Sequence, residues 1–397
     1  MKIRYSTILM WLLVLSPVAD NINGYLLLTG KNSNISIIFK TIIFLLCLAI
    51  AIKITTIQKI IQIICMLFFL VVQLVVFELN SPGGAGYNIS TLIKLLTPMV
   101  IVMAVRVLSV YDKNIITSIN KITDFYCWFF PISLTVPKLF NIGYSTYAGG
   151  VGSKGFYFSG NEISIVMIII LALEIEKYKN SRSRTDLFNI LLGMISVLYL
   201  GTKSVYISLA IFIVVALYSE QNINKKLLNF ILITPAILLG LWYVINNVTL
   251  VTQNINTLIW KYNVKSTGII NFLLSGRELQ IIHARESVYS ENVIRKLFWG
   301  IGPNMAENEL RVLIEMDLLD LFIRFGLIVS IIIARFYIKY IKKIMRTKQI
   351  LYIIGICLVY GASFFSGHMM FSPMVSIVLV VLLLKIEFTP EIMEKIS

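Results

Sequence analysis

Arg277 is the residue of this 397-residue chain best placed to bind a negatively charged group. It follows Ser275 and Gly276 and opens a stretch that we expect to form an amphipathic helix through about Lys296. Backbone N–H groups at a helix start and a guanidinium together favour anions. Apolar residues of the same helix would lie along a membrane surface: Ile281, Ile282, Val288 and Ile294.

A second set of charged residues lies between positions 315 and 324. Asp317, Asp320 and Arg324 are spaced i, i+3 and i+7, so they would share one face of a helix. Asp320 and Arg324 also suit a purely structural ion pair. Glu315 lies off that face and is freer to act as a base or ligand. Because Glu315 and Asp317 would point in different directions from a helix, we do not expect them to chelate a metal ion together.

Four further residues begin or end apolar runs, where an ionisable or polar side chain is costly unless it has a partner or a function. His368 could accept a proton or serve as a hydrogen-bonded core residue. Asn161 fits a helix cap and Glu162 fits a first turn, although both could also contact a ligand. Lys203 either binds an anion at its turn or extends its ammonium to the membrane surface.

Membrane helices must position these residues. The chain is 58% hydrophobic and 14% charged, with a mean hydropathy of +0.85. A soluble domain of this size could not bury so much apolar surface. The net charge of +15 does not indicate nucleic acid, because the basic residues lie mainly in short loops between apolar runs. The expected fold class is all-α: a polytopic integral membrane protein with about 12 transmembrane helices.

The predicted spans cover residues 6–27, 34–52, 59–78, 90–110, 122–140, 161–177, 187–201, 203–219, 227–246, 312–338, 350–366 and 368–385. With a cytoplasmic N-terminus, alternation puts 19 Lys and Arg residues in cytoplasmic segments and only Lys31, Lys154 and Lys203 in short outer loops. Both termini are therefore expected in the cytoplasm. The expected organisation is spans 1–9 in residues 1–246, one large extracytoplasmic loop with the amphipathic helix in 247–311, and spans 10–12 with a short tail in 312–397.

The order of short motifs resembles the Wzy-type polymerases of capsule and O-antigen assembly, within the wider O-antigen ligase/polymerase superfamily. The resemblance covers about residues 150–375. Lys203 departs from it, since many relatives carry arginine there. The motifs that carry it are Gly155–Glu162, Gly201–Ser204, Ser275–Arg277, Gly300–Pro303, Glu315–Asp320 with Phe325–Gly326, and Gly367–His368.

The resemblance implies a glycosyltransferase in the bacterial plasma membrane. It would join undecaprenyl-diphosphate-linked oligosaccharide units at the outer face in capsule, exopolysaccharide or O-antigen biosynthesis, without a metal ion or other cofactor. His368, Glu315 or Asp317 would be the base, with His368 preferred. The implied partners are the lipid-linked oligosaccharide, the bilayer, and the chain-length regulator and flippase of the same pathway, but no nucleic acid. The diphosphate and glycan would contact Arg277, Lys203, Arg324, Arg285, Glu162, Asn161 and Asp320.

Two alternatives stay open. A ligase that transfers finished glycan to another acceptor would use the same diphosphate-binding cations. A flippase for lipid-linked oligosaccharides would instead need charged residues deep within several spans. The sequence favours an enzyme over a flippase, because the ionisable groups cluster at the predicted outer ends, apart from Arg106.

Overall fold

The computed structural model describes residues 5–53, 70–112, 114–147, 152–218, 277–288, 292–346, 349–367 and 369–388. Within these ranges every regular element is a helix, as the sequence predicts. A helical segment covers Leu70–Asn80. The labelled helices are α1 (Tyr5–Leu28), α2 (Ile35–Lys53), α4 (Ala85–Tyr111), α5 (Ile115–Leu139), α6 (Gly160–Ser181), α7 (Arg184–Leu200), α8 (Lys203–Tyr218), α12 (Arg277–Val288), α13 (Val293–Trp299), the π-helical turn η1 (Met305–Glu309), α14 (Asp317–Ile344), α15 (Ile350–Ser366) and α16 (Pro373–Glu387).

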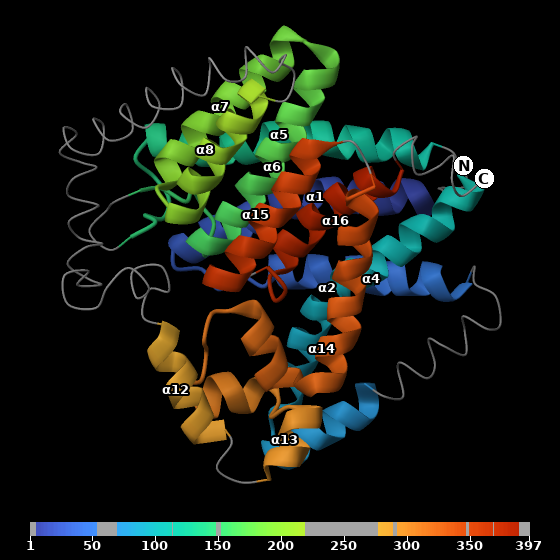
Figure 1. Ribbon diagram of the computed structural model, residues 1–397, viewed down its shortest axis with the longest axis vertical. Coiled ribbons are helices and arrows are strands. Elements are labelled where there is room, and N and C mark those ends of the chain that lie inside the picture. Colours follow the sequence, from blue (N-terminus) through green and yellow to red (C-terminus); the bar gives the residue numbers. More distant parts are fainter. Residues whose placement is uncertain are drawn as a thin grey trace.

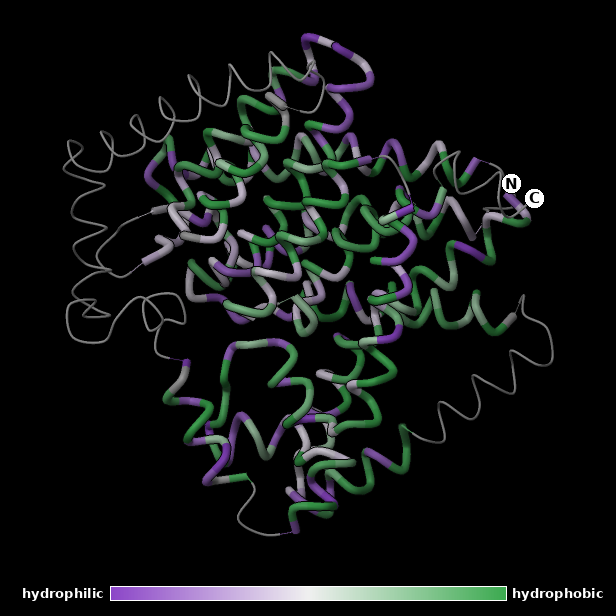
Figure 2. Tube along the Cα trace, in the orientation of Figure 1, coloured by the Kyte–Doolittle hydropathy of each residue, from purple (hydrophilic) through white to green (hydrophobic). Residues whose placement is uncertain are grey.

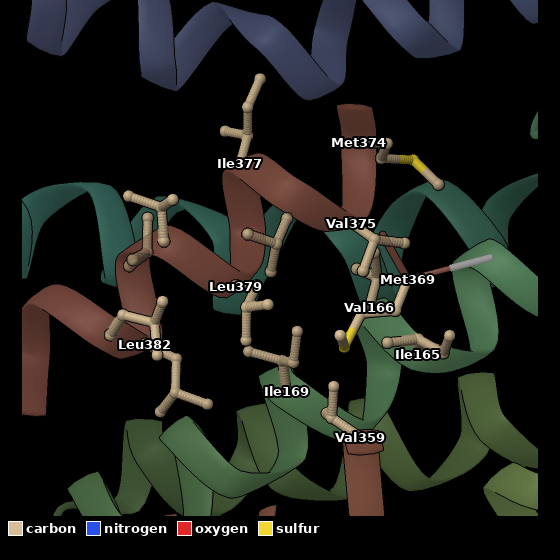
Figure 3. Packing of buried hydrophobic residues seen from close by; sticks show 14 of the residues in the cluster. Ile165, Val166, Ile169, Val359, Met369, Met374, Val375, Ile377, Leu379 and Leu382 are labelled. Carbon is tan, nitrogen blue, oxygen red and sulfur yellow. The ribbon is translucent and has the colours of Figure 1, made fainter. Parts of the chain in front are cut away.

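The core is built around α6 and α16, which pack against each other inside the helix bundle (Figure 1). Apart from Glu174 and Glu176 of α6, the buried stretches of both helices are mostly apolar, the pattern of a helix with no solvent face. In α6 every residue from Ile163 to Glu176 is buried, and in α16 every residue from Met374 to Leu384. Figure 3 shows Val166 and Ile169 of α6 close to Val375 and Leu379 of α16. These two helices form the scaffold on which the others pack.

Four of the described helices are long and apolar enough to cross a membrane: Tyr5–Leu28, Ile35–Ile52, Ala85–Tyr111 and Asp317–Ile344. Hydrophobic residues dominate the bundle, and hydrophilic ones gather at helix ends and connections (Figure 2). These features agree with a membrane protein. The expected spans near 59–78 and 227–246 lie partly or wholly outside the described residues, whereas each other expected span overlaps one helix. The number of spans and their sidedness stay predictions.

Hydrogen bonds connect helix ends that the expected topology places on the same face of the membrane. At one end of the bundle the Ser6 hydroxyl of α1 donates to the Asp112 carboxylate after α4, at 2.6 Å. At the other end the Ser372 hydroxyl donates to the Glu162 carboxylate at 2.7 Å, which joins the starts of α16 and α6. Helices α1 and α4 therefore run in opposite directions, and α6 and α16 run in the same direction, whichever face lies outside.

Helix α14 is broken at Gly326, whose φ of 72° and ψ of −178° are not helical. A glycine is required there, because a Cβ atom would stand 2.5 Å from the Gly300 nitrogen. Gly300 also has a positive φ of 77°, and a Cβ on it would stand 2.7 Å from the Gly326 nitrogen. The two glycines let the backbone before α14 touch the middle of that helix.

The break leaves carbonyl groups of α14 without their helical partners, and such groups are costly where water is absent. The Ile323 and Arg324 carbonyls accept the backbone N–H groups of Ile301 and Gly302, each at 3.0 Å. The Gln73 side-chain amide donates to the Phe325 carbonyl at 2.8 Å. The loop after α13 and the Leu70–Asn80 helix therefore complete the hydrogen bonding of the broken helix.

This arrangement predicts that Gly326→Ala destabilises the protein by about 1–3 kcal/mol or more, because alanine would combine a steric clash with a left-handed backbone. The apparent melting temperature of the purified protein in detergent measures the effect. Gly361→Ala in α15 is the matched control, since no described atom lies within 4 Å of the added Cβ. The control should melt at or above the wild-type temperature. Equal melting of Gly326→Ala and wild type would contradict the close approach of the two glycines.

Candidate functional site

Residues 277–288 and 292–316 form a small helical subdomain beside one end of the bundle (Figure 1). We call it the 277–316 subdomain. It comprises α12, α13, η1 and the chain leading to α14. The apolar residues of its own core are Ala284, Val288, Ile301, Ala306, Val312, Ile314, Met316 and Ile323. This core fixes the subdomain against the first turns of α14.

The prediction of one amphipathic helix through Lys296 is wrong. Helix α12 ends at Val288, and α13 begins at Val293 after Asn292, whose φ of 51° is left-handed. Val288 is buried in the subdomain core, so it does not lie along a membrane surface. Ile282 and Ile294 are 54% and 76% exposed, and their contact with a membrane stays a prediction.

Arg277 begins α12, as expected, and pairs with Glu315. The Arg277 Nη2 atom lies 2.7 Å from Glu315 Oε2. The arginine side chain is 11% exposed and the glutamate side chain 41% exposed, so the carboxylate is the more accessible partner. Glu315 is not in the helix that the sequence predicts, because α14 begins at Asp317. Its backbone is left-handed, with a φ of 58°, a strained conformation that is enriched at functional sites.

The Glu315 backbone lies against the turn before α16. A Cβ atom on Gly367 would stand 2.7 Å from the Glu315 carbonyl oxygen, and Gly367 has a φ of 63°. His368 itself lies outside the described residues. The site therefore joins two chain segments that are about fifty residues apart in the printed sequence: Glu315 with its arginine, and the turn that begins at Gly367.

The Asp317 carboxylate fastens these two segments together. Its Oδ2 atom accepts the Ser363 hydroxyl at 2.5 Å and the backbone N–H groups of Met369 at 2.8 Å and Met370 at 3.2 Å. The side chain is buried and its accepting oxygen already has three donors. This geometry favours a positioning role for Asp317 over that of a base.

Asp320 and Arg324 take separate partners, so the structure does not show the ion pair that their spacing suits. The Asp320 carboxylate accepts the backbone N–H of Ile314 at 3.0 Å. Arg324 instead pairs with Glu307 of η1, with Nη1 and Oε1 2.6 Å apart. The Tyr87 hydroxyl donates to the same Glu307 carboxylate. Arg324 is thus tied to the 277–316 subdomain and, through Glu307, to α4.

The Arg324 side chain is also covered by an aromatic ring. Its guanidinium carbon lies 4.5 Å from the ring centre of Phe371, a cation–π distance, and Phe371 stacks on Phe325. Only 4% of the arginine side chain is exposed. In this conformation Arg324 is enclosed and its charge is balanced by Glu307.

The start of α6 approaches the same region through Ser372, the residue after Phe371. Ser372 caps α16 and also donates to Glu162 at 2.7 Å. The cap of α6 is Ser159, whose hydroxyl oxygen accepts the Glu162 backbone N–H at 3.4 Å, so the expectation that Asn161 caps this helix is wrong. Asn161 lies within the first turn.

Three further lysine and arginine residues at helix ends or in loops have fewer described contacts. Lys203 is the first residue of α8. Arg285 lies in the last turn of α12 and is exposed. In the loop before α6, the Lys154 ammonium stands 5.8 Å from the Tyr144 ring centre and 6.0 Å from that of Phe158. Burial lowers the pKa of Lys154. Neither Arg285 nor Lys154 has an ion pair with the part of the chain that the structure describes.

Comparison with known proteins bears on part of this site. Residues 259–387 match the family model of O-antigen ligase like membrane proteins. The match supports the O-antigen ligase/polymerase superfamily, not the Wzy-type polymerases in particular. The candidates from Arg277 onward lie in this O-antigen ligase-like segment, whereas Asn161, Glu162 and Lys203 precede it. No curated protein and no solved structure matches the chain.

Sequence reasoning missed two residues of the site. In the sequence, Glu307 is one of several acidic residues before α14, and Tyr87 is one tyrosine near the start of an expected span. Their contact joins positions 220 residues apart. No local spacing signals such a pair.

Asp317→Ala should destabilise the turn around Gly367–Met370, because it leaves three buried donors without their acceptor. An unsatisfied buried donor costs about 1–3 kcal/mol. We expect a lower apparent melting temperature and faster amide exchange at Met369 and Met370. Asp124→Ala is the control, because Asp124 is 50% exposed and its pair with Lys177 should contribute at most about 1 kcal/mol. Unchanged exchange at the two methionines would remove Asp317 from its positioning role.

Proposed function

We propose that this chain is a polysaccharide polymerase that joins undecaprenyl-diphosphate-linked oligosaccharide units at the outer face of the bacterial plasma membrane. The observation that carries the proposal is the Arg277–Glu315 pair, which sets a cation and an accessible carboxylate side by side. The O-antigen ligase-like segment contains both residues and supports a membrane enzyme of surface-glycan assembly. Capsule, exopolysaccharide and O-antigen are the product classes that we consider.

The proposed reaction is a glycosyl transfer. A hydroxyl oxygen of one lipid-linked unit attacks the anomeric carbon of the other and forms the new glycosidic bond. The bond from that carbon to the diphosphate oxygen breaks, and the lipid diphosphate leaves with the electron pair. The hydroxyl proton passes to a protein base. The oxidation states do not change, so no redox cofactor enters the proposal, and we propose that no metal ion is needed.

In this mechanism Arg277 binds the diphosphate and stabilises the charge that develops on it. The guanidinium is engaged by Glu315 in the described conformation, so the incoming diphosphate would take over some of its hydrogen bonds. Releasing the Glu315 carboxylate from this pair would leave it free to accept the hydroxyl proton. The same exchange would thus load the substrate and prepare the base.

The enclosed residues have positioning roles in the proposal. Asp317 fixes the turn beside Glu315, while Asp320 holds the Ile314 backbone and Arg324 holds η1 through Glu307. His368 remains the competing base. Lys203 and Arg285 stay further candidates for the diphosphate, and Asn161 and Glu162 for the glycan.

Arg277→Ala should lower the rate of polymer formation about 10²–10³-fold, the usual cost of losing one preorganised charge-stabilising donor. Cells that carry it should accumulate single repeat units on the polyprenyl lipid, as seen by extraction and mass analysis. Arg311→Ala is the control, because Arg311 is an exposed arginine of the same subdomain and should leave polymer length unchanged. Normal polymer from Arg277→Ala, with the protein present in the membrane, would exclude Arg277 from the site.

Glu315→Gln should slow turnover about 10²–10⁴-fold while leaving the affinity for the lipid-linked donor within a few-fold of wild type, because the amide keeps the shape but accepts no proton. Purified enzyme assayed at saturating donor separates the two effects. Glu286→Gln, an exposed residue of α12, is the matched control. Full activity of Glu315→Gln combined with inactivity of His368→Gln would transfer the role of base to His368.

A glycan ligase is the second candidate, because the matching family model describes O-antigen ligase like membrane proteins. It would release the same lipid diphosphate and use the same residues. The accumulated intermediate separates the two functions. Loss of a ligase leaves long chains on the lipid without transfer, whereas loss of a polymerase leaves single units.

A further inference from the structure

A second charged cluster lies at the far end of α14 from the candidate site. The Glu387 carboxylate of α16 accepts Arg106 Nη2 of α4 at 2.6 Å and Lys343 Nζ of α14 at 2.5 Å. The Tyr340 hydroxyl donates to it at 3.2 Å. Three helices that are distant in sequence are thus joined around one acidic group.

The cluster carries more positive than negative charge. Lys339, one residue before Tyr340, is close enough to interact electrostatically with Arg106, Lys343 and Glu387. Three cations therefore lie near one carboxylate, and two of them, Arg106 and Lys343, pair with it. The cluster is also reachable, since the Arg106 side chain is 32% exposed and Lys339 is exposed. Such a surplus favours an added anion.

The flanks of the cluster are apolar and exposed. On α4, Met103 is 39% exposed and Val110 is 78% exposed. On α14, Ile331 and Ile338 are 57% and 47% exposed. In a membrane protein such side chains face lipid tails. A ligand at this place would therefore meet cations at one end and hydrocarbon along its length.

We propose that the ends of α4, α14 and α16 bind the headgroup of an anionic phospholipid. The phosphate would lie against Arg106 and Lys339, with the acyl chains along the exposed residues of α4 and α14. Basic pockets between membrane helices recognise anionic lipids by this combination of charge and apolar surface. The charge distribution predicts that this end of α14 is cytoplasmic. The inference does not depend on the proposed glycosyl transfer.

The experiment titrates the full-length protein in detergent with phosphatidylglycerol and counts bound lipids by native mass spectrometry. We expect one lipid to bind in preference to phosphatidylcholine. Lys339→Ala should weaken this binding about fivefold, the effect of one cation near the membrane surface. Lys121→Ala, which removes an exposed lysine from the same predicted face at the start of α5, should leave it unchanged.

Glu387→Gln gives the sharper test, because it removes the negative charge and should strengthen lipid binding. A variant that merely disturbed the helix ends would weaken it. Equal weakening by Lys339→Ala and Lys121→Ala would show only general attraction to basic residues and would overturn the proposal. Weaker binding by Glu387→Gln would overturn it as well. If inorganic phosphate bound to the protein as tightly as phosphatidylglycerol, the site would recognise phosphate alone, and a lipid site would be excluded.

Discussion

Satisfying backbone carbonyls inside an apolar bundle is the constraint on which the site depends. Breaking α14 at Gly326 frees carbonyls where water cannot reach them, and each would cost several kcal/mol unpaired. These carbonyls accept hydrogen bonds from the N–H groups of Ile301 and Gly302 and from the Gln73 amide. Because these donors lie in the loop after α13 and in the Leu70–Asn80 helix, the subdomain cannot shift without uncovering the break. The charged residues before α14 and in its first turns are held in place as a consequence.

Charge balance is the second constraint, and it changes what the arginines can do. The sequence suggests a gathering of free cations, yet Arg277 and Arg324 each have a carboxylate partner. An isolated buried charge is costly, so each carboxylate partner stabilises the arginine that it contacts. In the proposed reaction, the diphosphate would therefore have to replace a carboxylate on Arg277. Glu315, with its exposed side chain and strained backbone, is easier to displace than Glu307, which Tyr87 also holds.

The sequence predicts the helices well because long apolar runs leave few alternatives to helices in a membrane. It also places Arg277 correctly at a helix start. Two of its errors share one cause, which is that local spacing does not reveal contacts between distant positions. Arg324 suits Asp320 by spacing but pairs with Glu307, and Glu315 fits a helical pattern but lies in the turn packed against Gly367. No local pattern reports contacts across such separations.

The division of the chain indicates where the difference between polymerase and ligase must be sought. Both reactions expel the same lipid diphosphate, so Arg277, Glu315 and their supports would serve either one, and all lie in the O-antigen ligase-like segment. The acceptor is what differs. Several described contacts link the matched segment to earlier helices. Tyr87 of α4 donates to Glu307, Gln73 donates to the Phe325 carbonyl, and Ser372 donates to Glu162 at the start of α6. We therefore expect acceptor choice to depend on these earlier helices, to which the match does not extend.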